Sequence, residues 1–203
     1  VGSIDSIAQF AEWVEKIHVN RMNEECRFCI AIPCYYQELG VKNALSQYKK
    51  LAGDKKNFEI VLLLNAPSHN QIENSEAKKQ IDEFTKENPG FPIQVYSVTV
   101  PFQVKGKIGR LRWILTKLNM DRCLEANVPI SEMIHITHDA DLVDVPPEYL
   151  NKIQWYFQKN PNVQIVWGHV EYPEWFKGKY YLGFILQRVE DAFSIVWAHR
   201  NKT

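Results

Sequence analysis

The stretch Met133-Ile134-His135-Ile136-Thr137-His138-Asp139-Ala140-Asp141 joins a short apolar run to two carboxylates one residue apart. The run predicts a buried strand, and the acidic pair lies where that strand ends. At a strand's carboxyl end, oxygen ligands can hold a hard divalent cation beside a phosphate. The same short pattern is also typical of a solvated turn, or of an Asp that caps the helix starting near Pro146.

Other apolar runs alternate with segments of helical spacing on both sides of this stretch. Continuous apolar strands that alternate with helices are typical of a parallel sheet buried on both faces. The sequence therefore predicts an α/β fold with a mostly parallel central sheet flanked by helices on both faces. The predicted strands are 28–32, 58–64, 93–98, 133–137 and 163–168, and the predicted helices are 4–20, 39–51, 74–87, 107–125, 147–159 and 180–197.

Size and charge narrow the class of protein. The 203 residues are enough for one domain with a sizeable core. The 24 basic residues balance the 24 acidic ones, so the formal net charge is zero. Nothing in this balance indicates a nucleic-acid partner or a membrane surface.

The four cysteines and the absence of a long apolar run indicate in which cellular compartment the protein is expected. Cys26-x-x-Cys29 has the spacing of a zinc or redox pair, but only Cys34 lies near enough in sequence to help. Cys29 also begins an apolar run, which favours buried reduced thiols. With no apolar run of about 18 residues and no signal-like start, we expect a soluble, cytoplasmic protein.

Four polar segments follow predicted strands and are expected to meet at one edge of the sheet, because ligands of parallel sheets gather at the carboxyl ends of the strands. They are 33–38, 65–70, 105–112 and 139–141. This convergence favours a ligand site over a set of unrelated turns.

In order and spacing, these segments resemble the nucleotide-sugar-binding half of a GT-A fold glycosyltransferase, most like the large inverting family 2. The similarity runs from about residue 28 to 168. It is carried by the opening strand and loop 30–38, the second strand 59–65, the Gly- and Arg-containing loop 106–112, the Asp-x-Asp motif 139–141, and the segment 146–150.

The resemblance implies metal-dependent transfer of a sugar from a nucleotide-diphosphate sugar to an acceptor, with inversion. Mn²⁺ or Mg²⁺ would neutralise the leaving pyrophosphate and would be held by Asp139 and Asp141. Asp139 has the alternative role of facing the ribose and the sugar. The acceptor, whether glycan, lipid or small molecule, is not implied, and neither is membrane association.

The residues implied for the nucleotide sugar come from all four strand ends. A Tyr at the first strand end can stack on a base, and Lys or Arg can add positive charge near the pyrophosphate. For the basic residues, a solvated helix start is the alternative. The implied set is Pro33, Tyr35, Glu38, Asn65, Lys107, Arg110, Arg112 and Asp139.

The chain departs from the family pattern at the second strand end and at the base. Leu64-Asn65 stands where the family has paired Asp, so the nucleobase is not defined. An inverting enzyme needs a carboxylate base. Glu190 and Asp191 copy a family dipeptide and are weak candidates, and an ordinary helix face is the alternative.

These departures leave a second hypothesis, a catalytically inactive GT-A-like binding or scaffold domain that uses its aromatic carboxyl-terminal region. A nucleotidyltransferase is a third, but it would carry a Gly-rich loop directly after the first strand, and 32–36 has no Gly.

We expect one GT-A-like domain over 1–203, with an amino-terminal helix (1–25), a nucleotide-sugar-binding core (26–168) and a shortened acceptor-side region (169–203). His138, next to the acidic pair, either reaches a metal or bonds locally.

Overall fold

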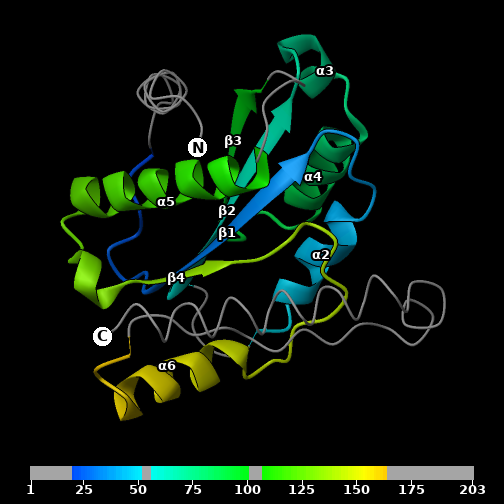
Figure 1. Ribbon diagram of the computed structural model, residues 1–203. Helices are drawn as coiled ribbons and strands as arrows, with labels where there is room; N and C mark the ends of the chain where they lie inside the picture. Colours follow the sequence, from blue (N-terminus) through cyan, green and yellow to red (C-terminus); the bar gives the residue numbers. More distant parts are fainter. Residues whose placement is uncertain (1–19, 52–55, 101–106, 164–203) are drawn as a thin grey trace, which may run out of the picture. The chain divides into compact units, whose positions relative to one another are not determined.

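The computed structural model describes residues 20–51, 56–100 and 107–163 (Figure 1). Residues 20–51, 56–100 and 107–159 belong to one compact unit. The predicted helix 180–197 lies outside the described residues, as do all but the last residue of the predicted helix 4–20 and all but the first residue of the predicted strand 163–168.

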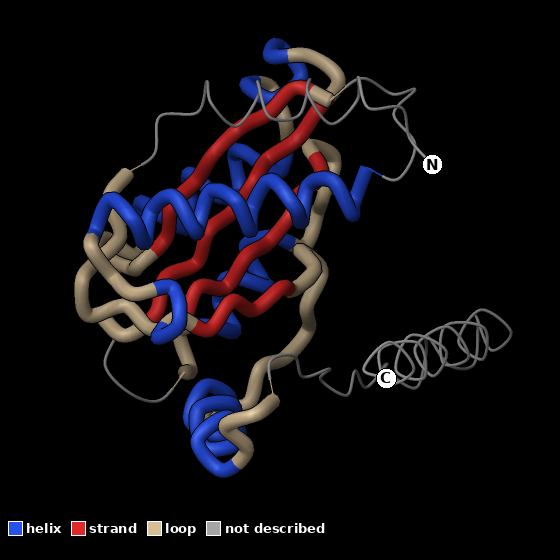
Figure 2. The backbone as a smooth tube through the Cα atoms, turned by 60° about the vertical axis from the view of Figure 1, so that its left-hand side comes forward, coloured by secondary structure: helices blue, strands red, loops and turns tan. Residues whose placement is uncertain are grey.

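Four parallel strands form the sheet. They are β1 (Phe28–Tyr35), β2 (Phe58–Ala66), β3 (Ile93–Thr99) and β4 (Ile134–Thr137), in the spatial order β3-β2-β1-β4. Figure 2 shows them side by side, crossed by one long helix, α5. The order reverses at β1, because β2 lies on one side of it and β4 on the other. The predicted parallel sheet is confirmed.

Helices cover both faces of this sheet (Figure 1). One face packs on α5 (Lys107–Ala126), and the other packs on α2 (Val41–Tyr48) and α4 (Glu76–Glu87). The remaining short elements are α3 (His69–Glu73), the 3₁₀ helix η1 (Ile130–Glu132) and α6 (Tyr149–Lys159). No helix in the described part of the chain is long and apolar enough to cross a bilayer.

Side-chain alternation along β1 divides the core in two. Ile30 and Ile32 belong to the cluster under α2 and α4, whereas Cys29 and Ala31 belong to the cluster under α5. Successive strand residues point to opposite faces, so a strand buried on both sides reads as one apolar run. The four cysteines are buried and form no disulfide, as the sequence predicts.

Strand β1 continues through Pro33, beyond the predicted end at Ile32. Proline lacks the N–H that a strand donates to its neighbour. Ala31 faces β4, because its carbonyl accepts from the His138 N–H at 3.1 Å, and Pro33 faces the same side two residues on. β4 pairs only with Phe28–Ala31, so no strand needs the missing donor.

The predicted helix 74–87 is confirmed as α4, and the short helix α3 that precedes it was not predicted. Ser75 has an extended backbone and its hydroxyl accepts from the Lys78 N–H at 3.1 Å, which makes it the N-cap of α4. The predicted helix 39–51 shortens to α2, whose first helical bond runs from the Ala44 N–H to the Gly40 carbonyl.

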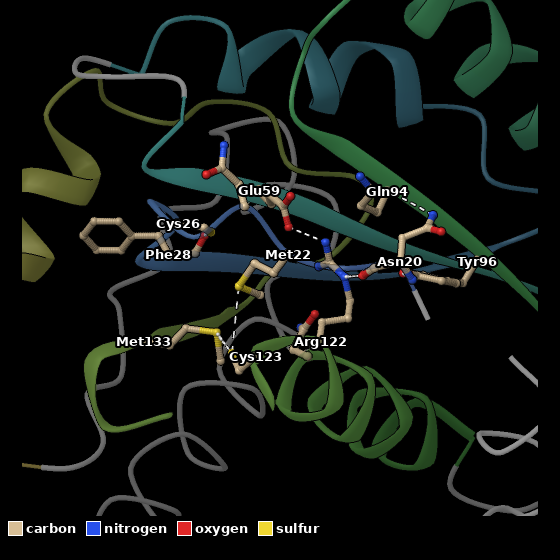
Figure 3. Close-up of polar contacts among 12 residues, drawn as sticks. Asn20, Met22, Cys26, Phe28, Glu59, Gln94, Tyr96, Arg122, Cys123 and Met133 are labelled. Carbon is tan, nitrogen blue, oxygen red and sulfur yellow. Dashed lines mark hydrogen bonds and ion pairs between the residues drawn. The ribbon is translucent and has the colours of Figure 1, made fainter. Parts of the chain in front are cut away.

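The α5 face of the sheet contains a buried ion pair between Glu59 on β2 and Arg122 on α5 (Figure 3). Arg122 is fully buried, and its Nε also donates to the Asn20 carbonyl at 2.9 Å. Asn20 in turn donates from its backbone to the Tyr96 hydroxyl and from its side chain to Gln94. The pair therefore joins β2, α5 and the start of the described chain.

Sulfur atoms gather beside this pair. The Cys123 Sγ lies 3.1 Å from the Met133 Sδ and 3.9 Å from the Met22 Sδ (Figure 3). The Cys26 thiol donates to the Phe28 carbonyl. These polarizable groups fill the space around the edge of α5.

Candidate functional site

A cavity of about 350 Å³ opens at the carboxyl edge of the sheet. It lies beside β1 and β4, where the strand order reverses, and this is the place where open parallel sheets bind their ligands. Six residues that the sequence analysis singles out line it. The lining residues are Pro33, Tyr35, Glu38, Asn65, Ile108, Leu111, Asp139, Ala140 and Asp141.

The acidic loop after β4 is anchored through its middle residue. Ala140 is buried in the core cluster under α2, whereas Asp139 and Asp141 on either side of it are exposed. A Cβ atom added to Gly40 would lie 4.0 Å from the Asp141 Cα, so the start of α2 runs close to the loop. Burial of Ala140 therefore leaves both carboxylates at the surface of the cavity.

Negative charge is concentrated here. Partial burial, together with the nearby Asp141 carboxylate, raises the pKa of Glu38, and Asp139 adds to this effect. Arg112 partly offsets the charge of these three carboxylates, because its Nη2 donates to the Asp139 Oδ1 at 2.7 Å. The local excess of carboxylates favours the arrival of a cation.

Asn65, at the end of β2, is buried and lines the cavity. Its Nδ2 donates to the Cys34 carbonyl at 2.6 Å, which fixes the orientation of the amide. The remaining hydrogen-bonding capacity of the side chain is its Oδ1 acceptor and a second N–H. Asn65 can therefore still accept a hydrogen bond from a ligand.

The first turns of α5 contribute apolar and basic residues. Ile108 and Leu111 line the cavity, whereas Arg112 reaches it through Asp139. The Arg112 Nε is buried without a hydrogen-bond partner in the described part of the chain. Lys107 is the first residue of α5, and Arg110 is not among the residues that line the cavity.

His138 bonds locally. Its Nδ1 lies 2.7 Å from the Tyr48 hydroxyl, and its Nε2 lies 2.8 Å from the Tyr149 hydroxyl. Burial lowers the pKa of His138 to about 4, with Asp139 opposing the shift, so the imidazole is neutral at pH 7. A neutral imidazole has one donor and one acceptor, which a pair of hydroxyls can satisfy.

The chemistry of the two aspartates fits a divalent cation. Within residues 20–51, 56–100 and 107–163, no group of three or more His, Cys, Asp or Glu side chains is placed to hold a metal ion. Mg²⁺ is commonly held by one or two carboxylates, with substrate phosphates and water as its other ligands. Asp139 and Asp141 match that partial set.

Three residues that line the cavity were not predicted as site residues, and the two predicted base candidates are not described by the structure. Ile108, Leu111 and Ala140 line the cavity but are apolar, and no sequence motif distinguishes them from core residues. Glu190 and Asp191 lie outside the described residues.

A second, smaller cavity of about 290 Å³ lies after the carboxyl end of α5. Glu24, Arg27 and residues 126–129 line it. Arg27 is already engaged there, since it donates to two backbone carbonyls and lies 3.7 Å from the Glu132 carboxylate. None of the predicted site residues lines this cavity.

No protein-family model matches the chain, and no curated protein matches it. Three solved structures that it resembles are S. aureus TarS residues 1–349 with UDP, the same protein with UDP-GlcNAc, and the mannosyltransferase PcManGT from Pyrobaculum calidifontis with GDP-Man and Mn²⁺. Their identities are 18%, 17% and 14%, and their TM-scores are 0.46, 0.45 and 0.43.

The matches cover 74%, 74% and 75% of this chain, and 39%, 38% and 39% of the respective structures. The chain thus spans less than half the length of each. The α/β fold described above rests on the strand order and register of this chain itself.

Proposed function

We propose that this chain binds a nucleotide-diphosphate sugar at the carboxyl edge of its sheet, with Mn²⁺ or Mg²⁺, and transfers the sugar to an acceptor. The observation that carries the proposal is the convergence of the predicted residues. Pro33, Tyr35 and Glu38 after β1, Asn65 on β2, and the two aspartates after β4 line one cavity. A set of unrelated solvated turns would not be expected to converge in this way.

In this proposal, Asp139 and Asp141 hold the cation, whose charge stabilises the pyrophosphate as the sugar–phosphate bond breaks. The exposure of both carboxylates leaves room for phosphate and water to complete the coordination. Glu38, close to Asp141, adds to the negative potential that attracts the cation.

Tyr35, Asn65 and Pro33 form the nucleoside side of the proposed site. The Tyr35 ring is partly exposed at the cavity, where it can stack on a base. Asn65 accepts from a base N–H through Oδ1, because its Nδ2 is engaged with the Cys34 carbonyl. Uracil and guanine both carry a suitable N–H donor.

Arg112 would change partners when the donor binds. Its pairing with Asp139 is half exposed and therefore weak, and its buried Nε has a hydrogen to donate. A pyrophosphate beside the cation would offer the guanidinium a stronger acceptor than a carboxylate already shared with a metal.

An inactive binding domain is the second candidate. The observation that favours it is that Asn65 stands in the place of the family's acidic residue. In addition, the only candidates for a catalytic base are Glu190 and Asp191, and both are weak. Such a domain would bind a nucleotide sugar or a partner without turnover.

The test is calorimetry with UDP-, GDP-, CDP- and dTDP-sugars, with and without Mn²⁺. We expect one donor to bind, and to bind more tightly with Mn²⁺. Asp141→Ala should abolish the Mn²⁺ effect. Asp144→Ala is the matched control, since Asp144 is an exposed acid on the same loop that pairs with Lys50 and does not line the cavity.

Absence of binding by every donor would reject the proposed function. Binding without release of nucleotide in the presence of glycan, lipid and small-molecule acceptors would favour the inactive domain. Where turnover occurs, the anomeric configuration of the product, measured by NMR, tests inversion.

A further inference from the structure

The residue that precedes the acidic pair joins three elements. The His138 ring lies between Tyr48 on α2 and Tyr149 at the start of α6, and each ring nitrogen is within 2.8 Å of one hydroxyl. The rings of Tyr48 and His138 are stacked with their centroids 5.9 Å apart. We name Tyr48, His138 and Tyr149 the histidine bridge.

The bridge fixes the acidic loop at its first residue. The His138 N–H donates to the Ala31 carbonyl, one step beyond the last paired residue of β4. With the ring held on both sides, the backbone that leads into Asp139 has little freedom. Two residues later, Ala140 is buried in the core, so the loop is anchored at both points.

Helix α6 makes the same contact through Tyr149. Leu150 is its buried residue, whereas Trp155 and Tyr156 are exposed. Tyr149 also packs against the core cluster under α2, and its hydroxyl is bonded to His138. The His138 imidazole therefore links α6 to the acidic loop directly, in addition to the core contacts that both make.

We propose that the histidine bridge positions Asp139 and Asp141 so that both carboxylates can engage one divalent cation, which makes His138 a positioning residue for the site. This inference rests on the proposed function as far as the cation is concerned. The geometric part, that the bridge orders the loop, does not depend on any ligand.

His135 provides a matched control. It lies on the same strand, is also partly buried, and is hydrogen-bonded through both ring nitrogens, to Thr116 and Asn119 on α5. It therefore resembles His138 in type, burial and bonding, but its partners are on the other face of the sheet. Loss of either ring should cost stability, and only loss of His138 should disturb the acidic loop.

The experiment titrates Mn²⁺ alone into wild type, His138→Phe, His138→Gln and His135→Phe by calorimetry. We expect His138→Phe to weaken Mn²⁺ binding about tenfold or more, because residues that orient metal ligands commonly contribute that much to affinity. His138→Gln retains a donor and an acceptor and should recover part of the affinity. His135→Phe should stay within about twofold of wild type at equal folded fraction.

A second measurement needs no ligand. NMR order parameters of residues 139–141 and amide exchange in α6 report the ordering of the loop and the helix. We expect His138→Phe, Tyr48→Phe and Tyr149→Phe to lower the order parameters, with exchange in α6 faster in His138→Phe and Tyr149→Phe. His135→Phe should leave both unchanged.

The outcomes separate the two proposals. If wild type binds no Mn²⁺ alone while His138→Phe still loosens the loop, the cation part of this inference fails and the ordering role of the bridge stands. The proposed function is rejected separately, by absence of binding of every donor. If the His138 and His135 variants change affinity and loop order equally, the bridge is ordinary packing and the inference is overturned.

Discussion

Two arginines of helix α5, ten residues apart in sequence, pair with carboxylates, one on β2 and one on the acidic loop after β4, and the two pairs differ in burial. The side chains of Arg122 and Glu59 are 0% and 8% exposed, whereas those of Arg112 and Asp139 are 42% and 62% exposed. The buried pair lies among core residues, and the exposed pair lies at the candidate site.

The difference separates a structural pair from an exchangeable one. When one member of a buried ion pair is removed, the other is left as an uncompensated charge away from water, which is strongly destabilising. Charges left in water lose little when separated. A carboxylate that must release its arginine to a ligand therefore has to belong to a solvent-exposed pair. Asp139 belongs to such a pair.

The strongest test of this contrast is to make the same change in both arginines. Arg122→Met should lower the free energy of unfolding by about 3–5 kcal/mol, because Glu59 is left as a buried unpaired charge. Arg112→Met should lower it by less than about 1 kcal/mol. Urea unfolding at pH 7 measures both.

A double variant, Arg122→Met with Glu59→Met, checks the reason for that loss. Removing both charges should recover a large part of the stability lost in the single variant. Equal losses for Arg122→Met and Arg112→Met would contradict the contrast, and so would a double variant less stable than the single one.

Protonation provides the next test, since His138 is a partly buried titrating group directly before the acidic loop. The pKa of His138 falls from 6.5 in the unfolded chain to about 4 in the fold. The stability tied to the neutral ring is present above pH 6.5 and is lost as the pH falls towards 4. Between pH 7 and pH 5 this amounts to roughly 2 kcal/mol.

Urea unfolding of wild type and His138→Gln at both pH values isolates this contribution, because the other groups titrate alike in the two proteins. The variant should lose less stability on acidification than wild type. Identical pH dependence would show that the ring is accessible to water and protonates freely in the fold.

The same contrast marks what the sequence could predict. The apolar runs predicted all four described strands, because strands buried on both faces cannot alternate with polar residues. The segments 33–38, 65–70 and 139–141 were predicted from their place after those runs, since parallel topology brings strand ends together. Within them, Glu38 and Asn65 were implied by the family resemblance. Strand ends were therefore the most predictable part of the candidate site.

Contacts between elements were less predictable. The Arg122–Glu59 pair joins residues 63 positions apart, and the Tyr48–His138 bond joins residues 90 apart. Neither pairing leaves a pattern of spacing in the sequence. Ala140 was also missed as an anchor, because an alanine between two aspartates gives no sign of whether it is buried.

A smaller effect concerns Arg112 and ligand binding. Arg112→Gln frees Asp139 from a competing cation, so Mn²⁺ alone should bind a few-fold more tightly. The nucleotide sugar with Mn²⁺ should bind about tenfold more weakly, because a charge-assisted bond to the pyrophosphate is lost. Calorimetry resolves the two signs, and a change of the same sign for both ligands would place Arg112 outside the site.

The smallest expected effect is at the thiols, and it tests the boundary between the exposed cavity and the buried core. Cys34 lies between Pro33 and Tyr35, both of which line the cavity, yet it is fully buried in the core cluster under α2. Burial raises the pKa of Cys34 and of Cys26 to about 12, so only about one thiol in ten thousand is ionised at pH 8. A thiol reagent at pH 8 should therefore leave both cysteines unmodified by mass spectrometry until urea unfolds the chain. Rapid native modification of Cys34 alone would mean that the cavity extends into the sheet, and the distinction between an open edge and a closed core would then fail at that strand.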